Sequence, residues 1–205
     1  AHDADALLDK MNGISFVVNP TRQDAITRGT LSNDDFDGEM YNVSYHIESI
    51  EEKGLPIDPI NAYNLFAIYL RWCIEHDLMG EDFLNEYGEV AKQVKADPAS
   101  VDLRAFIRDK LNGQIMVPMF NQIGRAFTSY YYGKPDSPNF PRDIENYALE
   151  YLGPEKYYSD EFQFKAPLFI PFDEDYYQAM AKVIEERFTN WQGQDFDEDT
   201  LEPSE

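Results

Sequence analysis

The stretch that most constrains the fold is residues 61–78, which read NAYNLFAIYLRWCIEHDL. A helix over these residues would be apolar on nearly every side: Tyr63, Leu65, Phe66, Ile68, Tyr69, Leu70, Trp72, Cys73 and Ile74. Such a helix belongs in the middle of a fold, where other elements cover it. The run is too short and too rich in Tyr, Asn and charge to span a membrane.

This central helix has one polar stripe, formed by Asn61, Asn64, Arg71 and Glu75, with Ile68 in the gap. We expect the stripe to be the edge that reaches water or a polar neighbour. Arg71 and Glu75 are four residues apart, which predicts a surface ion pair. His76 follows at the end of the helix, where an imidazole suits the negative end of the helix dipole.

Amphipathic patterns predict further helices at residues 81–96, about 100–111, 120–132 and 142–152, and a last helix after Asp173 as N-cap. Asp97-Pro98, Asn112-Gly113 and Gly153-Pro154 are stop signals. The inward side of residues 81–96 is predicted to hold Phe83, Leu84, Tyr87, Val90, Ala91 and Val94. The last helix carries the clearest stripe: Tyr177, Met180, Ala181, Ile184, Phe188 and Trp191.

Two segments are predicted as strands. Residues 14–18 are β-rich and end at a turn signal, and residues 41–50 alternate Tyr41, Val43, Tyr45 and Ile47. The aromatic residues 157–172 are expected to be extended. The sequence thus predicts a mainly α (α+β) fold, in which five to six helices surround the central helix beside a small N-terminal strand pair. Its expected parts are an N-terminal extension (1–40), a helical domain (41–193) and a mobile acidic tail (194–205).

The formal net charge is −22, with 39 acidic against 17 basic residues. A field of this sign repels nucleic acid and anionic membranes and attracts basic proteins, although it also serves solubility alone. The single cysteine, Cys73, lies within the apolar helix and favours a reducing compartment. We find no apolar leader, and the chain begins Ala-His without Met, which fits a processed or engineered start. A cytoplasmic location is expected.

The sequence contains no recognisable catalytic motif. No glycine-rich phosphate loop, nucleophile elbow or zinc-ligand spacing is present, so no catalytic residue, cofactor or metal is expected. His46 and Glu48 are interpreted as ordinary polar residues on the outer face of a strand. The acidic stretch from Asp34 to Glu39 lacks the ligand spacing of a calcium-binding loop and is interpreted as a solvated loop. Arg104, Arg108 and Lys110 are expected to be balanced by acidic neighbours.

A predicted aromatic strand that begins at Tyr41 and four motifs after it occur in order over about 150 residues. The four motifs are the helix pattern from Phe66 to Glu75 (Phe-x-x-x-Leu-x-Trp-Cys-Ile-Glu), the helix end Leu111-Asn112-Gly113, the segment from Ala126 to Gly133, and Arg187 to Trp191. In these motifs the chain resembles a family of small, acidic, uncharacterised bacterial proteins that look like immunity proteins of polymorphic toxin systems. The resemblance implies a protein that binds and neutralises a toxin.

We therefore predict a non-catalytic protein whose acidic, Tyr-bearing surface occludes a cognate basic toxin. The predicted contacts are Asp34, Asp35, Asp37, Glu39, Glu48, Glu51, Glu52, Tyr130, Tyr131 and Tyr132. The three tyrosines are adjacent in a helix, so at least one is expected at the surface. Two alternatives stay open: a carboxylate- and metal-dependent enzyme, and a chaperone or regulatory protein for a secreted effector.

Overall fold

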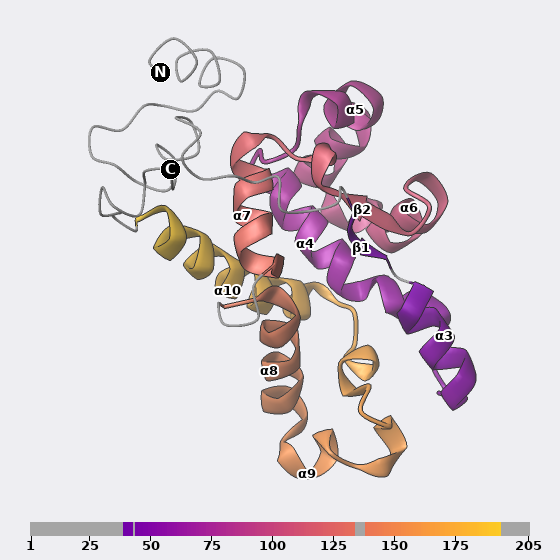
Figure 1. Ribbon diagram of the computed structural model, residues 1–205. Helices are drawn as coiled ribbons and strands as arrows, with labels where there is room; N and C mark the ends of the chain where they lie inside the picture. The colour runs from indigo at the N-terminus through magenta and orange to yellow at the C-terminus, as the bar shows by residue number, and fades with distance from the viewer. Residues whose placement is uncertain (1–38, 43, 134–137, 194–205) are drawn as a thin grey trace, which may run out of the picture.

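The computed structural model describes residues 39–42, 44–133 and 138–193. The strand predicted at 14–18, the acidic residues Asp34, Asp35 and Asp37, and the predicted acidic tail lie outside this part of the chain. The described residues are mainly helical, as predicted, and surround one central helix (Figure 1).

The central helix, α4, spans Asn64–Glu75 and follows a 3-10 turn, η1 (Pro59–Tyr63), whose N-cap Asp58 accepts from the backbone of Ile60. Ten of its twelve residues are buried, and Arg71 and Glu75 are the two that are not. The helix ends where Asp77 adopts a positive φ of 58°, and the amide of Leu78 donates to the carbonyl of Cys73. This is a Schellman-type ending, with Asp77 at a position that usually holds glycine.

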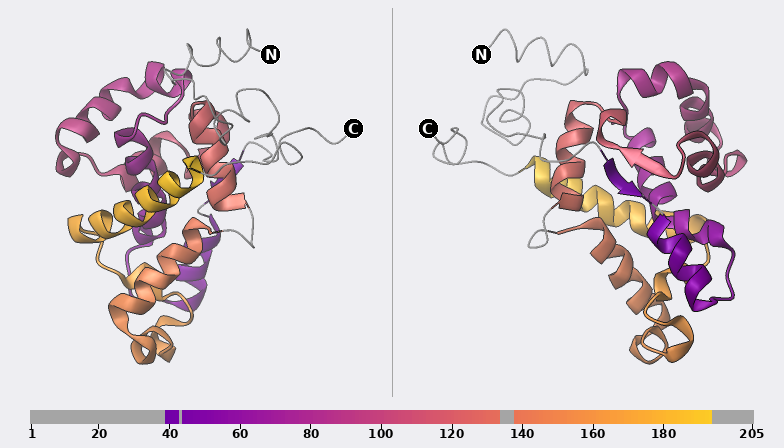
Figure 2. Two further views of the ribbon diagram at one scale, coloured as in Figure 1. Left: turned by 90° about the vertical axis from the view of Figure 1, so that its left-hand side faces the viewer. Right: turned by 45° about the vertical axis from the view of Figure 1, so that its right-hand side comes forward.

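Four helices pack around α4, and their predicted positions are confirmed to within a few residues. They are α5 (Glu81–Ala96), α6 (Leu103–Lys110), α7 (Gln122–Gly133) and α10 (Glu174–Gln192). The side chain of Asp173 accepts from the amide of Tyr176, which confirms the predicted N-cap of α10. The fifth predicted helix, α8 (Phe140–Leu152), packs against α7 and α10. It points toward the end of the molecule opposite α5 (Figures 1 and 2).

The strand predicted at residues 41–50 is wrong over most of its length. The strand β1 covers Glu39–Asn42, and residues Ser44–Lys53 form helix α3. Ser49 and Ile50 are buried and Ile47 is half-buried, a spacing of three that fits a helix. β1 pairs antiparallel with β2 (Gln114–Met116), with Tyr41 opposite Ile115, so its partner is far away in the sequence.

The prediction that residues 157–172 are extended is wrong as well. It contains the end of a short helix, α9 (Pro154–Tyr157), and two 3-10 turns, η4 (Asp160–Phe162) and η5 (Ala166–Phe169). Pro154 is the first residue of α9 and Pro167 is the second residue of η5, positions where a missing amide is tolerated. Two aromatic side chains of this segment, Phe162 and Phe169, are therefore placed against each other by turns and not by a strand.

Aromatic rings fill the space between α4, α7, α8 and α10. The Tyr69 ring lies 5.3 Å from that of Phe140, and the Phe127 ring lies 4.9 Å from that of Phe188. Tyr69 also shares a hydrogen bond of 2.8 Å with Thr128, which satisfies its buried hydroxyl. This packing fixes α4 relative to three neighbouring helices and makes it the rigid support of the surface elements.

Candidate protein-binding site

The predicted acidic contacts are only partly described. Glu39 lies in β1, and the three aspartates before it lie outside the described residues. Glu48, Glu51 and Glu52 are exposed on α3, and their spacing of three and four places them on one face of that helix. The structure thus gathers these three carboxylates, although on a helix and not beside a strand.

The three predicted tyrosine contacts do not form one surface. Tyr131 is fully buried, and its hydroxyl donates to Oδ2 of Asp143 at 2.5 Å, so Tyr131 is not a surface anchor and this prediction is wrong. Burial and the Asp143 carboxylate raise the pKa of the Tyr131 phenol. Arg187 donates to both oxygens of the same carboxylate at 3.0 and 3.1 Å. Tyr130 and Tyr132 are half-buried against the core, which agrees with the expectation that the three rings cannot all face one core.

The polar stripe of α4 is confirmed, and its groups are satisfied within the chain. Arg71 donates to Glu75 at 2.6 Å and to both oxygens of Glu174 on α10, and its guanidinium lies 3.6 Å from the centre of the Tyr177 ring. Burial alone would lower the pKa of Arg71, but the hydrogen bonds to Glu174 and Glu75 outweigh it and raise that pKa. The predicted surface pair is therefore a half-buried clamp between α4 and α10.

Two of the three basic residues of α6, Arg104 and Arg108, and the histidine after α4 also have partners inside the chain. Arg104 contacts Asp102 and the amide oxygen of Asn64 at 3.2 Å, and Arg108 contacts Asp109 at 2.8 Å. His76 Nδ1 lies 2.8 Å from the carbonyl of Trp72, as its predicted role at the helix end requires. These contacts are made within the chain, so we assign these polar groups a structural role.

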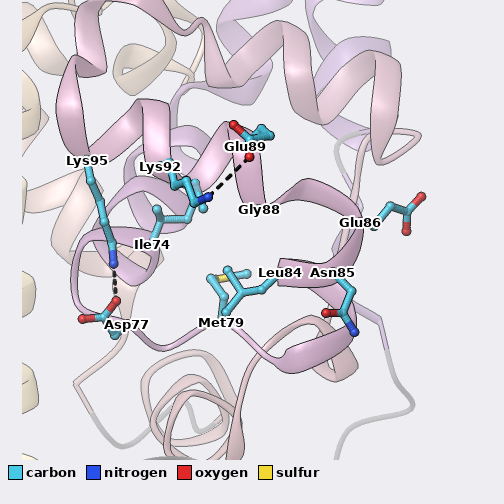
Figure 3. Close-up of a pocket in the computed structure, with 11 residues that line it drawn as sticks. Ile74, Asp77, Met79, Leu84, Asn85, Glu86, Gly88, Glu89, Lys92 and Lys95 are labelled. Atoms are coloured by element: carbon cyan, nitrogen blue, oxygen red, sulfur yellow. Dashed lines mark hydrogen bonds and ion pairs between the residues drawn. The ribbon is translucent and has the colours of Figure 1, made fainter.

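A different surface has the form of a binding site. A pocket of about 450 Å³ opens between α5 and the end of α4 (Figure 3). Its lining is Ile74, Asp77, Met79, Leu84, Asn85, Glu86, Gly88, Glu89, Ala91, Lys92 and Lys95. We call this pocket and the hollow that adjoins it the α5 groove.

The floor of the α5 groove is apolar. Ile74 and Met79 are buried within it, and Leu84 stands at its edge with 43% of its surface exposed. In Figure 3 the side chains of Met79 and Leu84 lie close together, so the exposed leucine adjoins the buried methionine. An exposed leucine beside an apolar floor offers contact area to a partner's side chain.

A kink in α5 explains why Leu84 is exposed, contrary to the prediction that it faces the core. Tyr87 has non-helical angles (φ −121°, ψ 24°), so the two halves of α5 do not share one register. Phe83 and Ala91 stay buried on the core side, while Leu84 turns outward. The signal in the sequence is that Leu84 stands among Glu81, Asp82, Asn85 and Glu86, all of them polar.

Charge at the rim of the groove is uneven. Lys95 pairs with Asp77 and Lys92 pairs with Glu89, so both lysines are neutralised within the pocket (Figure 3). Three exposed carboxylates in the first half of α5, those of Glu81, Asp82 and Glu86, have no ion-pair partner in the described part of the chain. The rim nearest Leu84 is therefore the negative one.

The groove continues toward α7. A second hollow of about 740 Å³ shares Asp77, Met79, Leu84 and Asn85 with the first and is lined further by Gly80, Glu81, Asp82, Pro118, Phe120, Asn121, Gln122 and Arg125. Its base is tied down by backbone bonds: the amide of Gly80 donates to Met119 at 2.7 Å, and the amide of Asn121 donates to Leu78 at 2.9 Å. A rigid base reduces the entropy lost when a partner docks.

Neither a cluster of metal-binding side chains nor a membrane-spanning helix occurs among the described residues. No group of three or more metal-binding side chains occurs among them. The thiol of Cys73 is fully buried, and burial raises its pKa, so it is a core group. None of the helices in the described ranges is long and apolar enough to cross a membrane.

Comparison with known proteins identifies the family. Residues 39–160 match the model of a family described as a domain of unknown function (DUF7832). The match covers more than half of the 205-residue chain, and the protein therefore belongs to this family. No curated protein and no solved structure matches the chain.

Proposed function

We propose that this protein is a non-catalytic binding protein that neutralises a basic partner by covering it, as an immunity protein neutralises its toxin. One observation carries the proposal: an exposed leucine and an apolar floor lie beside three carboxylates that have no ion-pair partner within the described chain. An apolar centre with a charged rim is the usual anatomy of a protein interface.

The chemistry of the α5 groove defines the partner. The matching segment would place one bulky apolar side chain against Leu84 and Met79, with Lys or Arg residues toward Glu81, Asp82 and Glu86. The net charge of −22 would speed the encounter with such a protein over a long range. The immunity class itself is supported by the resemblance of the core motifs, and we propose the α5 groove as the place of contact.

The test is affinity capture from the native lysate with three baits. They are the unchanged chain, a groove variant (Glu81→Lys, Asp82→Lys, Glu86→Lys) and a control (Glu48→Lys, Glu51→Lys, Glu52→Lys). Both variants change the net charge by the same amount. A difference in capture between them therefore depends on where the charges lie and not on the total charge. We expect one small basic protein on the unchanged and control baits and its loss from the groove variant.

Two results would contradict this proposal. Equal capture by all three baits would remove the groove as the contact site, while leaving a basic partner in place. Capture of no basic protein, at about 50 mM as well as about 500 mM salt, would remove the function itself. Identification of the captured protein by mass spectrometry then gives the chemistry that it carries out.

A further inference from the structure

A second surface lies at the other end of the molecule, around α9, where large apolar side chains face the solvent. Of the four large hydrophobic residues that are exposed among the described residues, three lie here: Tyr151 (55%), Tyr158 (63%) and Phe164 (86%). We call residues 151–165 and the neighbouring Lys53 the distal surface. α9 and α5 lie at opposite ends of the molecule in every view (Figures 1 and 2).

Phe164 is held outward by an unusual backbone. Gln163 and Phe164 both have positive φ, of 45° and 62°, and a bulky residue is costly in this region. The bend is secured because the Lys165 amide donates to the Phe162 carbonyl at 2.7 Å, and the Gln163 side chain donates to the Lys53 carbonyl at 3.1 Å. The Phe164 ring is exposed, so no contact of this ring with the described residues offsets the strain.

A pocket with room for a phenyl ring is lined in part by residues close to Phe164 in the sequence. The pocket has a volume of about 390 Å³ and is lined by Pro56, Tyr151, Leu152, Lys156, Glu161, Phe162, Phe169 and Pro171. Phe162, two residues before Phe164, forms part of its wall, and the Phe162 and Phe169 rings are 4.5 Å apart. A cavity of about 150 Å³ already holds a benzene molecule, so a phenyl ring fits here.

The charge of the distal surface differs from that of the whole chain. Residues 151–165 contain Glu155, Asp160 and Glu161 against Lys156 and Lys165, which gives this segment a net charge of −1. The surface is thus nearly neutral in a molecule of net charge −22. A second copy of the chain would be repelled by most of the acidic surface but not by this part.

We propose that the distal surface joins two copies of the chain into a symmetric dimer, in which Phe164 of each copy enters the aromatic pocket of the other. A twofold axis makes this contact twice, because each copy brings both the protruding ring and the pocket. The exposed rings of Tyr151 and Tyr158 then border the inserted ring. The acidic and basic side chains of each copy face those of the other.

The test is sedimentation velocity over about 1 to 100 µM protein, a range in which mass action reveals a weak dimer. The unchanged chain is expected to shift from monomer toward dimer across this range. Phe164→Ser and Phe164→Gly are expected to stay monomeric, and the glycine variant also removes the backbone strain, so misfolding cannot explain its result. Leu84→Ser, which removes the exposed leucine at the other end, is the matched control and is expected to dimerise unchanged.

Added salt separates this contact from the acidic groove. Dimerisation is expected to strengthen between about 50 and 500 mM NaCl, because screening reduces the repulsion between two acidic chains. Capture of a basic partner should weaken over the same range. A chain that stays monomeric at about 100 µM would overturn the proposal, and so would a dimer that persists in both Phe164 variants.

Discussion

Single residues determine how closely α7 approaches the end of α4. A Cβ on Gly124 would lie 2.5 Å from the carbonyl oxygen of Leu78, a contact with backbone that cannot easily move. We expect Gly124→Ala to lower the free energy of unfolding by about 2 kcal/mol, measured by urea denaturation. Gly88→Ala is the control, because its added methyl group meets nothing within 4 Å and should gain about 0.5–1 kcal/mol. Equal losses in the two variants would contradict the packing described for α7.

Tyr131 is a structural residue and not a binding residue. Tyr131→Phe removes the hydrogen bond to Asp143 and leaves that buried carboxylate with Arg187 alone, so we expect a loss of about 1–2 kcal/mol of stability. Tyr158→Phe, at an exposed position, should cause no measurable change in the free energy of unfolding. Capture of the basic partner should be the same for Tyr131→Phe as for the unchanged chain. If Tyr131→Phe abolished capture without affecting stability, the Tyr131 hydroxyl would have to be accessible to the partner, which would contradict its burial against Asp143.

At the scale of elements, α3 should make the fold sensitive to acid. Burial, with a smaller contribution from Lys165, lowers the pKa of His46 from 6.5 to about 4. In the folded chain His46 thus stays neutral at pH values where the unfolded chain has bound a proton. The stability associated with His46 is therefore complete above about pH 6.5 and is lost as the pH falls toward about 4.

We expect urea denaturation at about pH 7 and pH 5 to show a smaller acid-induced loss in His46→Gln than in the unchanged chain, by about 1 kcal/mol. The carboxylates that titrate in the same range are common to both proteins, so the difference isolates the imidazole. Identical pH dependence in the two proteins would show that His46 is not held neutral by the packing of α3.

Most of the helices could be predicted from the sequence, whereas the short elements and the site could not. Repeating apolar positions and clear ends marked α4, α6 and α10, because those signals are local. The alternation over residues 41–50 fitted a strand, but β1 ends at Asn42, where it pairs with the distant β2, and the residues after it form α3. The exposure of Leu84 depends on the kink at Tyr87, which no repeat in the sequence reveals.

For the whole molecule, the excess of negative charge has a cost that salt should relieve. With a net charge of −22, repulsion within the folded chain exceeds that in the more expanded unfolded chain. We expect the midpoint of thermal unfolding to rise by several degrees between about 50 and 500 mM NaCl. A midpoint that falls with salt would mean that the ion pairs, such as that of Arg71 with Glu174, outweigh the repulsion.

The two proposed surfaces lie at opposite ends and need not compete (Figure 1). A dimer joined at the distal surface would present two α5 grooves and could bind two partners, or a partner with two sites. Two linked contacts hold a bivalent target far more tightly than one. The Phe164 variants should therefore affect binding to a dimeric target more than binding to a monomeric one.

The most direct test of the central claim is the association rate between this chain and its captured basic partner, measured by stopped flow as a function of salt. We predict that the rate for the unchanged chain falls at least about tenfold between 50 and 500 mM NaCl, and that the groove variant of α5 loses most of this dependence. The α3 variant, with the same charge change, should keep most of it. A salt dependence that is equal in both variants would contradict the assignment of the acidic, apolar α5 groove as the binding site.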